Sequence, residues 1–403
     1  MERIEGGHVT SAGGFRASGV TAGLKASGRP DLALLVSDAP ATAAGVFTTN
    51  QVRAYNVDRS RSLLAAHHRL QVVLVNSGNA NVATGAQGKR DTDRLAAIIG
   101  TELGCAADLV AVAQTGVIGV PLPMDLMAAG LPRLARELSP EGGPAAAEAI
   151  CTTDTHLKQG AVRLDLGGVP VTIGAMAKGA GMIHPNMATM LCFVATDAAL
   201  GHAALHNALV TAVDRTLNNL SIDGDQSTSD TCLILANGLA GGAAVTELDD
   251  PRLETFTAGL TAVLEPLAAA IARDGEGATK LLAVKVTGAR TQLDARLAAR
   301  SVASSNLVKC AVAGGDPNWG RIACAVGYSP AEVDQTRLTI TVCQVLLLFG
   351  GEPVAFDAGA VRAAMAGPEV MVHVDLGLGH AEAMAFGCDL TEEYVRFNAD
   401  YTT

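Results

Sequence analysis

The sequence predicts an α/β (α+β) fold in which layered mixed β-sheets are flanked by helices, with a smaller lobe at the C-terminal end. Short apolar runs rich in β-branched residues, such as residues 71–75, alternate with segments of helical spacing, without a regular period or repeat. The chain has 403 residues, enough to bury a large core. Aromatic residues make up only 3% of the chain, so aliphatic side chains must supply that core.

The individual elements follow from the same patterns. Residues 9–27 are rich in Gly, Ser, Thr and Ala, and we expect loops and edge strands there. Short apolar runs bounded by polar or glycine-containing segments predict strands at residues 32–36, 43–48, 71–75, 109–113, 162–166, 169–175, 190–195, 232–235, 281–286, 338–348 and 370–376. Apolar residues at helical spacing predict helices at residues 91–103, 124–138, 145–151, 203–217, 251–273, 292–304 and 306–313. The segment Gly85-Ala-Gln-Gly88 lacks a dinucleotide-binding fingerprint and is expected to be a loop.

Composition excludes several classes of protein. The net charge of −11, with no basic patch, argues against nucleic acid as a partner. The amino terminus lacks the apolar core of a signal peptide, and no uninterrupted run reaches the ~18 apolar residues that cross a bilayer, so we expect a cytoplasmic protein without membrane contact. None of the eight cysteines forms a C-x-x-C pair, so we expect neither disulfides nor a metal site.

One stretch, residues 178–194, places a threonine at an unusual position. Thr189 follows a loop made of two glycines and a Pro-Asn pair, and it precedes a short apolar run. Its hydroxyl could attack the carbonyl of Ala188 and break the chain there. The freed threonine would carry a hydroxyl beside an α-amino group of pKa ~7.7–8.0, which can act as its base. On these residues alone, the more common role of such a threonine, the polar first residue of a strand, is favoured.

The run KGAGMIHPNMATML resembles the signature of the ornithine acetyltransferases, also called glutamate N-acetyltransferases. Other segments that resemble this family span nearly the whole chain: Asn76-Ser-Gly-Asn-Ala-Asn81, Gln114-Thr-Gly-Val-Ile-Gly119, Thr152-Thr-Asp-Thr155, Asp225-Gln-Ser-Thr-Ser-Asp-Thr231, Asp274-Gly-Glu-Gly-Ala-Thr-Lys280, Gly315-Asp-Pro-Asn-Trp-Gly-Arg321 and Asn398-Ala-Asp-Tyr-Thr-Thr403. The resemblance implies self-cleavage between Ala188 and Thr189. The products would be an alpha fragment, residues 1–188, and a beta fragment, residues 189–403, which includes a C-terminal lobe from about residue 281 to 403.

The resemblance also implies a reaction. Thr189 would take the acetyl group of N2-acetyl-L-ornithine, form an acetyl-enzyme and pass the group to L-glutamate in a ping-pong cycle. Thr115 and Gly116 match the family's oxyanion hole, where each donor is worth roughly 10²–10³ in rate. Without the resemblance, these two residues could simply form the turn at the end of a strand.

The substrate contacts that the resemblance implies are Thr152, Lys178, Thr189, Glu276, Asn398 and Thr403. Each has a plain structural alternative. Lys178 could be a solvated charge at a strand end, Thr152 a helix-terminal hydroxyl, and Glu276 a solvated residue at a helix C-cap. Because chain ends usually fray, a role for Asn398 and Thr403 would require the C-terminus to fold back into the site.

Other residues match family motifs without receiving a role here. A threonine with its own amine needs no imidazole, so His184 is not expected to be the base. Trp319 is expected to brace a turn. No catalytic role is assigned to Asp230, Asp316, Asn318, Trp319 or Arg321.

Several alternatives stay open on the sequence. Transfer to water would make the protein an aminopeptidase-like N-terminal-nucleophile hydrolase, and a structural Thr189 would leave a non-catalytic amino-acid-binding protein. A related acetyltransferase of a secondary pathway would use the same chemistry. We expect no cofactor, although acetyl-CoA could serve as a second donor and add N-acetylglutamate synthase activity. The resemblance implies a heterotetramer of two alpha and two beta fragments.

Overall fold

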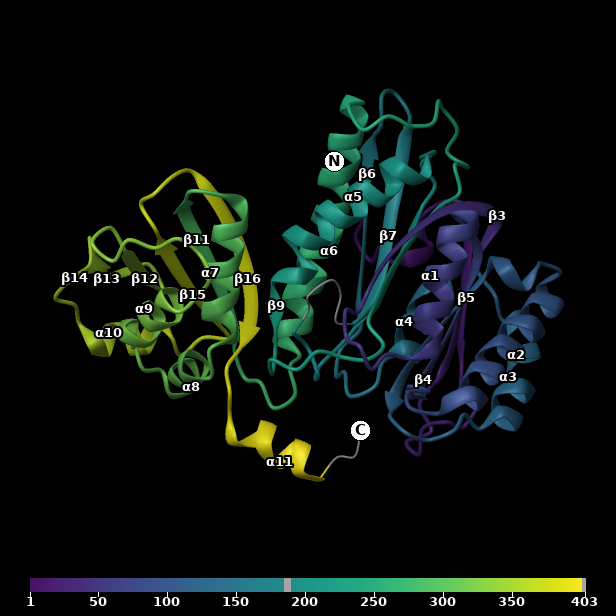
Figure 1. Ribbon diagram of the computed structural model, residues 1–403, viewed down its shortest axis with the longest axis horizontal. Helices are drawn as coiled ribbons and strands as arrows, with labels where there is room; N and C mark the ends of the chain where they lie inside the picture. The colour runs from purple at the N-terminus through teal and green to yellow at the C-terminus, as the bar shows by residue number, and fades with distance from the viewer. Residues whose placement is uncertain (185–189, 401–403) are drawn as a thin grey trace.

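The computed structural model describes residues 1–184 and 190–400, and it contains two mixed sheets (Figure 1). Within these residues the larger sheet has nine strands in the order β1-β6-β7-β8-β10-β3-β4-β5, with β2 paired to β3. Its strands are β1 (Glu2–Arg3), β2 (Phe15–Val20), β3 (Leu32–Phe47), β4 (Arg69–Asn79), β5 (Val110–Val117), β6 (Lys158–Asp165), β7 (Pro170–Lys178), β8 (Leu191–Thr196) and β10 (Thr231–Ala236). The predicted fold class is confirmed.

Strand β8 lies in the middle of this sheet. It pairs antiparallel with β7, with Leu191 opposite Lys178, and parallel with β10, with Leu191 opposite Thr231. Because successive side chains of a strand point to opposite faces, Cys192 and Val194 join one core cluster while Leu191 and Phe193 join another. The strand is therefore buried on both faces, as its continuous apolar run predicted.

The smaller lobe contains most of the second sheet. Within the described residues this sheet has seven strands in the order β14-β13-β12-β15-β11-β16-β9. They are β9 (Leu220–Ser221), β11 (Leu281–Ala289), β12 (Thr339–Val342), β13 (Val345–Phe349), β14 (Glu352–Pro353), β15 (Glu369–Asp375) and β16 (Ala381–Cys388). Strand β9 comes from the part of the chain that otherwise builds the larger lobe, so its pairing with β16 joins the two lobes.

Helices cover both sides of the larger sheet and pack in the smaller lobe (Figure 1). Helices α5 and α6 share a core with β6, β7, β8 and β10, and α2 and α3 share another with β2 to β5. Residues of α1 and α4 belong to a third core, which they share with side chains of β3, β4, β5, β8 and β10. The helices are α1 (Tyr55–His67), α2 (Gly85–Leu103), α3 (Met124–Arg136), α4 (Gly143–Ile150), α5 (His202–Arg215), α6 (Pro251–Arg273), α7 (Gln292–Ser304), α8 (Asn306–Gly314), α9 (Trp319–Gly327), α10 (Ala358–Ala364) and α11 (Glu392–Asp400).

One helix in the described part of the chain, α6, is long and apolar enough to cross a membrane by length and composition alone. In the structure, 56% of its most apolar window is buried. Its side chains Phe256, Leu260 and Leu264 belong to the core shared with the larger sheet. The helix is thus built into the core of the larger lobe.

The structure corrects several predicted elements. The expected strands 32–36 and 43–48 are one long strand, β3, whose pairing with β4 shifts between Val36 and Ala41. The expected strand 338–348 is the hairpin of β12 and β13, because Cys343 and Gln344 form a turn with positive φ although neither is glycine. The expected loop Gly85–Gly88 is the first turn of α2, where the Asn81 side chain donates to the Gly88 carbonyl at 3.0 Å.

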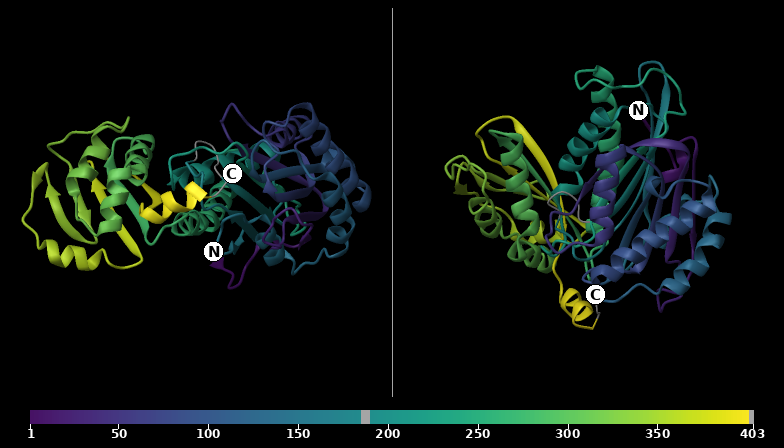
Figure 2. Two further views of the ribbon diagram at one scale, coloured as in Figure 1. Left: turned by 90° about the horizontal axis from the view of Figure 1, so that it is seen from below. Right: turned by 45° about the vertical axis from the view of Figure 1, so that its right-hand side comes forward.

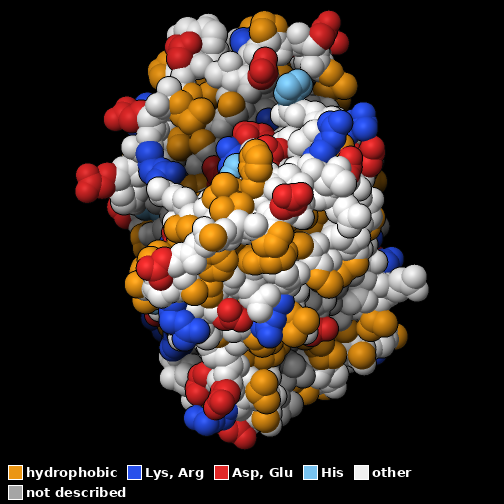
Figure 3. Space-filling view, turned by 90° about the vertical axis from the view of Figure 1, so that its left-hand side faces the viewer, with side chains coloured by type: hydrophobic (Ala, Val, Ile, Leu, Met, Phe, Trp, Pro, Cys, Tyr) orange, Lys and Arg blue, Asp and Glu red, His pale blue; other side chains and the backbone are white. Residues whose placement is uncertain are grey.

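The C-terminal helix α11 lies below the junction of the two lobes (Figures 1 and 2). None of its described residues is buried. On the face of the smaller lobe shown in Figure 3, acidic and basic side chains are interspersed, with apolar ones between them. The C-terminal approach to the site, predicted from the sequence, therefore depends on a helix with no buried residue among those described.

Candidate active site

A cavity of about 400 Å³ opens where the larger lobe, the end of α6 and α11 meet. Six of the residues implied by the sequence resemblance line it: Thr115, Gly116, Thr152, Lys178, Glu276 and Asn398. They come from five separate segments of the chain, so their convergence is a property of the fold. Thr189, Ala188 and Thr403 lie outside the described residues.

Thr115 and Gly116 end strand β5 at one wall of the cavity. Gly116 has a φ of +130°, and a Cβ there would overlap the backbone of Gly78 and Asn79 at the end of β4. Only glycine fits this close approach without strain. The glycine-containing motif thus brings two strand ends together and exposes Thr115 and Gly116 to the cavity.

Buried amides hold these strand ends in place. Gln114 donates to the Asn76 side chain at 2.9 Å, and Asn81 donates to the Gln114 side chain at 3.0 Å. Because unpaired amides would be costly in the interior, such a network fixes the conformation of the loop. The polar residues of the 76–81 motif act here as supports, a role that the sequence did not identify.

Lys178, the last residue of β7, is nearly buried, and its ammonium donates to the Thr152 hydroxyl at 3.2 Å. Strand β8 begins beside it, since Leu191 pairs with Lys178. The start of β8 therefore lies beside the strand end that carries this cation. The interpretation of Lys178 as a solvated surface charge is wrong.

Glu276 also lines the cavity and is held by three segments. Its N–H donates to the Ala180 carbonyl at 2.8 Å, and its carboxylate accepts from Thr153 at 2.7 Å and from Asn398 of α11 at 3.1 Å. A Cβ on Gly181 would overlap the Glu276 carboxylate oxygens. The glycine therefore makes room for the acid, which is partly buried at the wall of the cavity.

A buried ion-pair network fixes the segments that carry these residues. Lys158 lies between Asp154 and Asp274, and Asp154 also accepts from the N–H groups of Thr152 and Gly179. Burial alone would raise the pKa of Asp154, but the ammonium groups of Lys158 and Lys178 hold it below its usual value. A single carboxylate thus locks the loop of Thr152 to the end of β7.

Asp223 and Tyr394 also line the cavity, and the sequence did not single them out as site residues. Asp223 accepts from the N–H groups of Met182 and Ile183 at 2.6 and 2.9 Å, and its burial raises its pKa. Burial also raises the pKa of Tyr394, and a hydrogen bond between Tyr394 and Asp223 raises it further. The dense group of acids and hydroxyls at residues 223–231 was the signal in the sequence that could have identified this wall.

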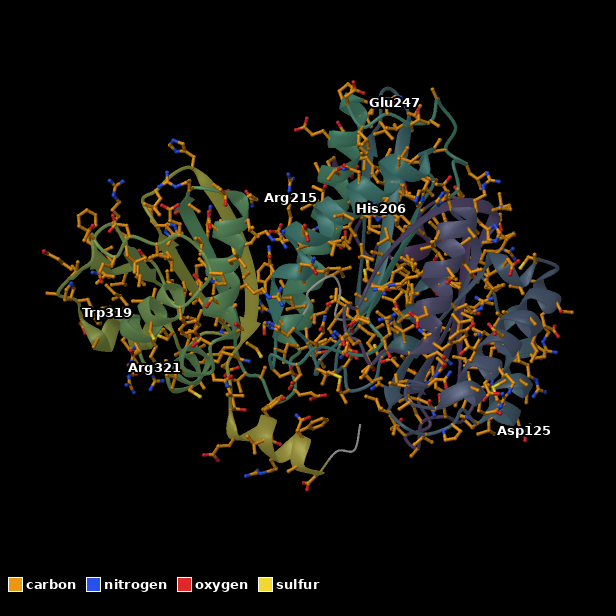
Figure 4. The ribbon with its side chains drawn as sticks, viewed as in Figure 1. Asp125, His206, Arg215, Glu247, Trp319 and Arg321 are labelled. Atoms are coloured by element: carbon orange, nitrogen blue, oxygen red, sulfur yellow. The ribbon has the colours of Figure 1, made fainter. Side chains whose placement is uncertain are left out.

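His184 is held as a neutral structural side chain. One ring nitrogen lies 2.9 Å from the Ser221 hydroxyl, and burial, with the nearby Arg300, lowers the pKa of His184 to about 4. Among the described residues no group of His, Cys, Asp or Glu side chains has the arrangement of a metal site. Trp319 and Arg321 lie on the outer side of the smaller lobe (Figure 4), where Trp319 begins α9 behind its cap Asn318.

Comparison with known proteins identifies the family. The model of the ArgJ family matches residues 16–403. The chain belongs to the ArgJ family. The arginine biosynthesis bifunctional protein ArgJ of Symbiobacterium thermophilum is 52% identical over 405 residues, covering 100% of both chains. The protein of the same name from Geobacillus kaustophilus is 43% identical over 400 residues, covering 99% of this chain and 97% of the relative.

A solved ArgJ structure agrees with this assignment. The crystal structure of arginine biosynthesis bifunctional protein ArgJ from Bacillus halodurans is 41% identical, with a TM-score of 0.50, and covers 52% of this chain and 98% of that chain. An ornithine acetyltransferase from Mycobacterium tuberculosis, solved with ornithine, is 43% identical over 46% of this chain and 98% of that chain, with a TM-score of 0.44. The family predicted from the sequence is confirmed, and as an ArgJ protein the chain is an acyltransferase of arginine biosynthesis.

Proposed function

We propose that this protein transfers the acetyl group of N2-acetyl-L-ornithine to L-glutamate through an acetyl-enzyme on Thr189. The nucleophile would be freed by self-cleavage between Ala188 and Thr189, leaving fragments 1–188 and 189–403. The observation that carries the proposal is the set of charges in one cavity, which is lined by the cation Lys178 and by the acids Glu276 and Asp223.

This charge arrangement fits both substrates. Acetylornithine and glutamate each carry an α-carboxylate, and a buried lysine is a suitable partner for it. The side chain of acetylornithine ends in an ammonium group, which a carboxylate such as Glu276 can bind. Asn398 and Thr153 orient that carboxylate by hydrogen bonds of 3.1 and 2.7 Å. We assign Thr152 and Thr403 to the same substrate-binding set.

The reaction then runs in two matching halves. The Thr189 hydroxyl attacks the acetyl carbonyl while its α-amino group takes the hydroxyl proton. Thr115 and the N–H of Gly116 stabilise the oxyanion of the tetrahedral intermediate. When the C–N bond breaks, the proton passes from the ammonium to the departing ornithine nitrogen, leaving acetyl-threonine. The amine of glutamate attacks this ester, and the same steps run in reverse.

Self-cleavage has separate support. The Bacillus halodurans ArgJ chain is covered almost fully by a match to 52% of this chain. A cut before Thr189 would give a fragment of 215 out of 403 residues, or 53%. That solved chain therefore has about the size expected of one product of such a cut.

Further parts of the proposal concern donors, assembly and location. The relatives are named bifunctional, which favours acetyl-CoA as a second acetyl donor and an added N-acetylglutamate synthase activity. No other cofactor is proposed. We propose a heterotetramer of two alpha and two beta fragments, working in the cytoplasm.

An assay of the purified protein with acetylornithine tests the proposal. With glutamate present, we expect ornithine and N-acetylglutamate to form in equal amounts. Thr189→Ala should remain a single chain and lose transfer completely, because it has neither the nucleophile nor the freed threonine. Acetate release that does not depend on glutamate would instead favour a hydrolase, and glutamate binding without any acetyl exchange would favour a binding protein.

A further inference from the structure

Asp230 is a buried acid that the reaction described above does not use. It precedes β10 and is only 2% exposed. Its Oδ2 has no hydrogen-bond partner among the described residues, while the Ser227 hydroxyl bonds to the carboxyl group. A buried polar atom without a partner is costly and therefore rare in folded proteins. The free oxygen of Asp230 needs a functional explanation.

The sheet places Asp230 beside the start of β8. The N–H of Thr231, the next residue, donates to the Met190 carbonyl at 2.9 Å, and Thr231 pairs with Leu191. Asp230 is therefore level with Met190, and Met190 is covalently joined to residue 189. Asp230 and Met190 also line one small cavity of about 20 Å³, together with Thr115 and Lys178. This volume suits one small polar group.

The charged groups around the cavity leave Asp230 Oδ2 without a cationic partner of its own among the described residues. Lys178 of β7 is the only other charged residue among the described residues that line it, and the Lys178 ammonium donates to Thr152. The remaining polar side chains there are the hydroxyls of Thr115, Ser227 and Ser229. Burial raises the pKa of Asp230 well above its usual value, against the opposing effects of Ser227 and Lys178. The carboxyl group can thus be neutral until a positive group arrives next to it.

We infer that Asp230 positions the α-amino group that self-cleavage creates on residue 189 and binds that group as an ammonium. The inference rests on the proposed function. After the cut, the new amine takes the proton of the Asp230 carboxyl group, so an ammonium and a carboxylate face each other. Above the pKa of this ammonium its proton passes to solvent, so in the working cycle the free amine takes the Thr189 proton. The Asp230 carboxylate stabilises the ammonium that forms again in this step, without being protonated itself. Asp230 is therefore a positioning residue.

The pH profile of Asp230→Asn tests this role. A nearby carboxylate favours the ammonium and raises the pKa of the amine, so its removal should lower that pKa by about 1–3 units. The acidic limb of kcat/KM for acetylornithine should move to lower pH by the same amount. Without Asp230 the amine is a weaker base and its ammonium is no longer stabilised. The plateau value of kcat/KM should therefore fall by about 10- to 100-fold. Asp230→Asn should still cut itself.

Asp197→Asn is the matched control. Asp197 is a buried acid just beyond the other end of β8, where it accepts from the N–H groups of Gly13 and Thr172. Its substitution should lower thermal stability without moving the acidic limb. A limb that stays in place in Asp230→Asn, as in the control, would overturn the inference. A folded Asp230→Asn chain that remains uncut would do so as well, because Asp230 would then act before any amine exists.

Two further results keep the test decisive. If Asp230→Asn fails to fold, the profile of the wild-type protein is decisive by itself: an acidic limb above the usual amine range of ~7.7–8.0 supports the inference, and a limb within or below that range contradicts it. A wild-type protein that is uncut or transfers no acetyl group would refute the proposed function. A cut, active wild type with an unshifted variant would refute the role of Asp230 alone.

Discussion

Gly181 has no side chain, and this absence determines where the Glu276 carboxylate can lie. The added Cβ of an alanine would overlap both carboxylate oxygens, so Glu276 would have to move away from Thr153 and Asn398. The φ of Gly181 is not positive, so alanine brings no backbone strain there. The effect of the substitution should therefore be limited to the acid that we expect to bind the acetylornithine ammonium.

Gly181→Ala should reduce kcat/KM for acetylornithine by about 10- to 100-fold. This is the effect expected when the displaced Glu276 carboxylate loses its charge-assisted hydrogen bonds to the substrate ammonium. Steady-state kinetics at fixed glutamate measures it, with a thermal melt to confirm folding. Gly160→Ala is the matched control, since a Cβ at Gly160 in β6 meets nothing within 4 Å. Equal kinetics for the two variants would show that the position of Glu276 does not matter.

At the scale of elements, α11 and the residue before it reach the cavity through polar contacts. Asn398 donates to Glu276, Thr391 donates to the Gly277 carbonyl at 2.7 Å, and Tyr394 bonds to Asp223. Gly277 has a φ of +70°, and a Cβ there would overlap the Tyr394 backbone. The helix therefore contributes walls and hydrogen bonds to the site but little to the core.

Deletion of residues 391–403 should leave the fold intact and damage catalysis. Since no described residue of α11 is buried, we expect the melting temperature to fall by no more than about 3 °C. The value of kcat/KM should drop by about 100-fold, because Glu276 loses a hydrogen bond and the cavity loses a wall. Val395→Ala, at an exposed position on the same helix, should match the wild type. A truncated chain with full activity would rule out a role for the C-terminus.

Elements with a strong apolar pattern were predicted from the sequence. Elements whose conformation depends on contacts with distant parts of the chain were not. The run at 190–195 was recognised as a buried strand because both of its faces are apolar. Helix α11 was not predicted, since it has no buried face to leave a pattern in the sequence. The hairpin turn at Cys343 and Gln344 was also missed, because it has no glycine to mark its positive φ angles.

The candidate site shows the same division. The motifs supplied six residues that line one cavity, but no local pattern indicates that the loops after α4, β7 and α6 meet there. That meeting depends on Lys158, whose neighbours Asp154 and Asp274 are distant from each other in sequence. Asp223 and Tyr394 likewise become neighbours only in the folded chain.

At the scale of the whole molecule, the two segments on either side of residue 189 are interlocked. Strands β8 and β10, which follow residue 189, lie between β7 and β3, which precede it. Their side chains Phe193 and Leu233 share a core with Leu35 and Val73 of the first segment. A cut before Thr189 would break one peptide bond and leave all of this packing in place. The two fragments should therefore behave as one folded unit.

Mass spectrometry of the purified, active protein tests the central claim most directly. Under denaturing conditions we predict two masses, those of residues 1–188 and 189–403, while native conditions keep the fragments together and Thr189→Ala gives one full-length mass. A fully active preparation that shows only the mass of the intact 403-residue chain would contradict a freed Thr189 as the nucleophile.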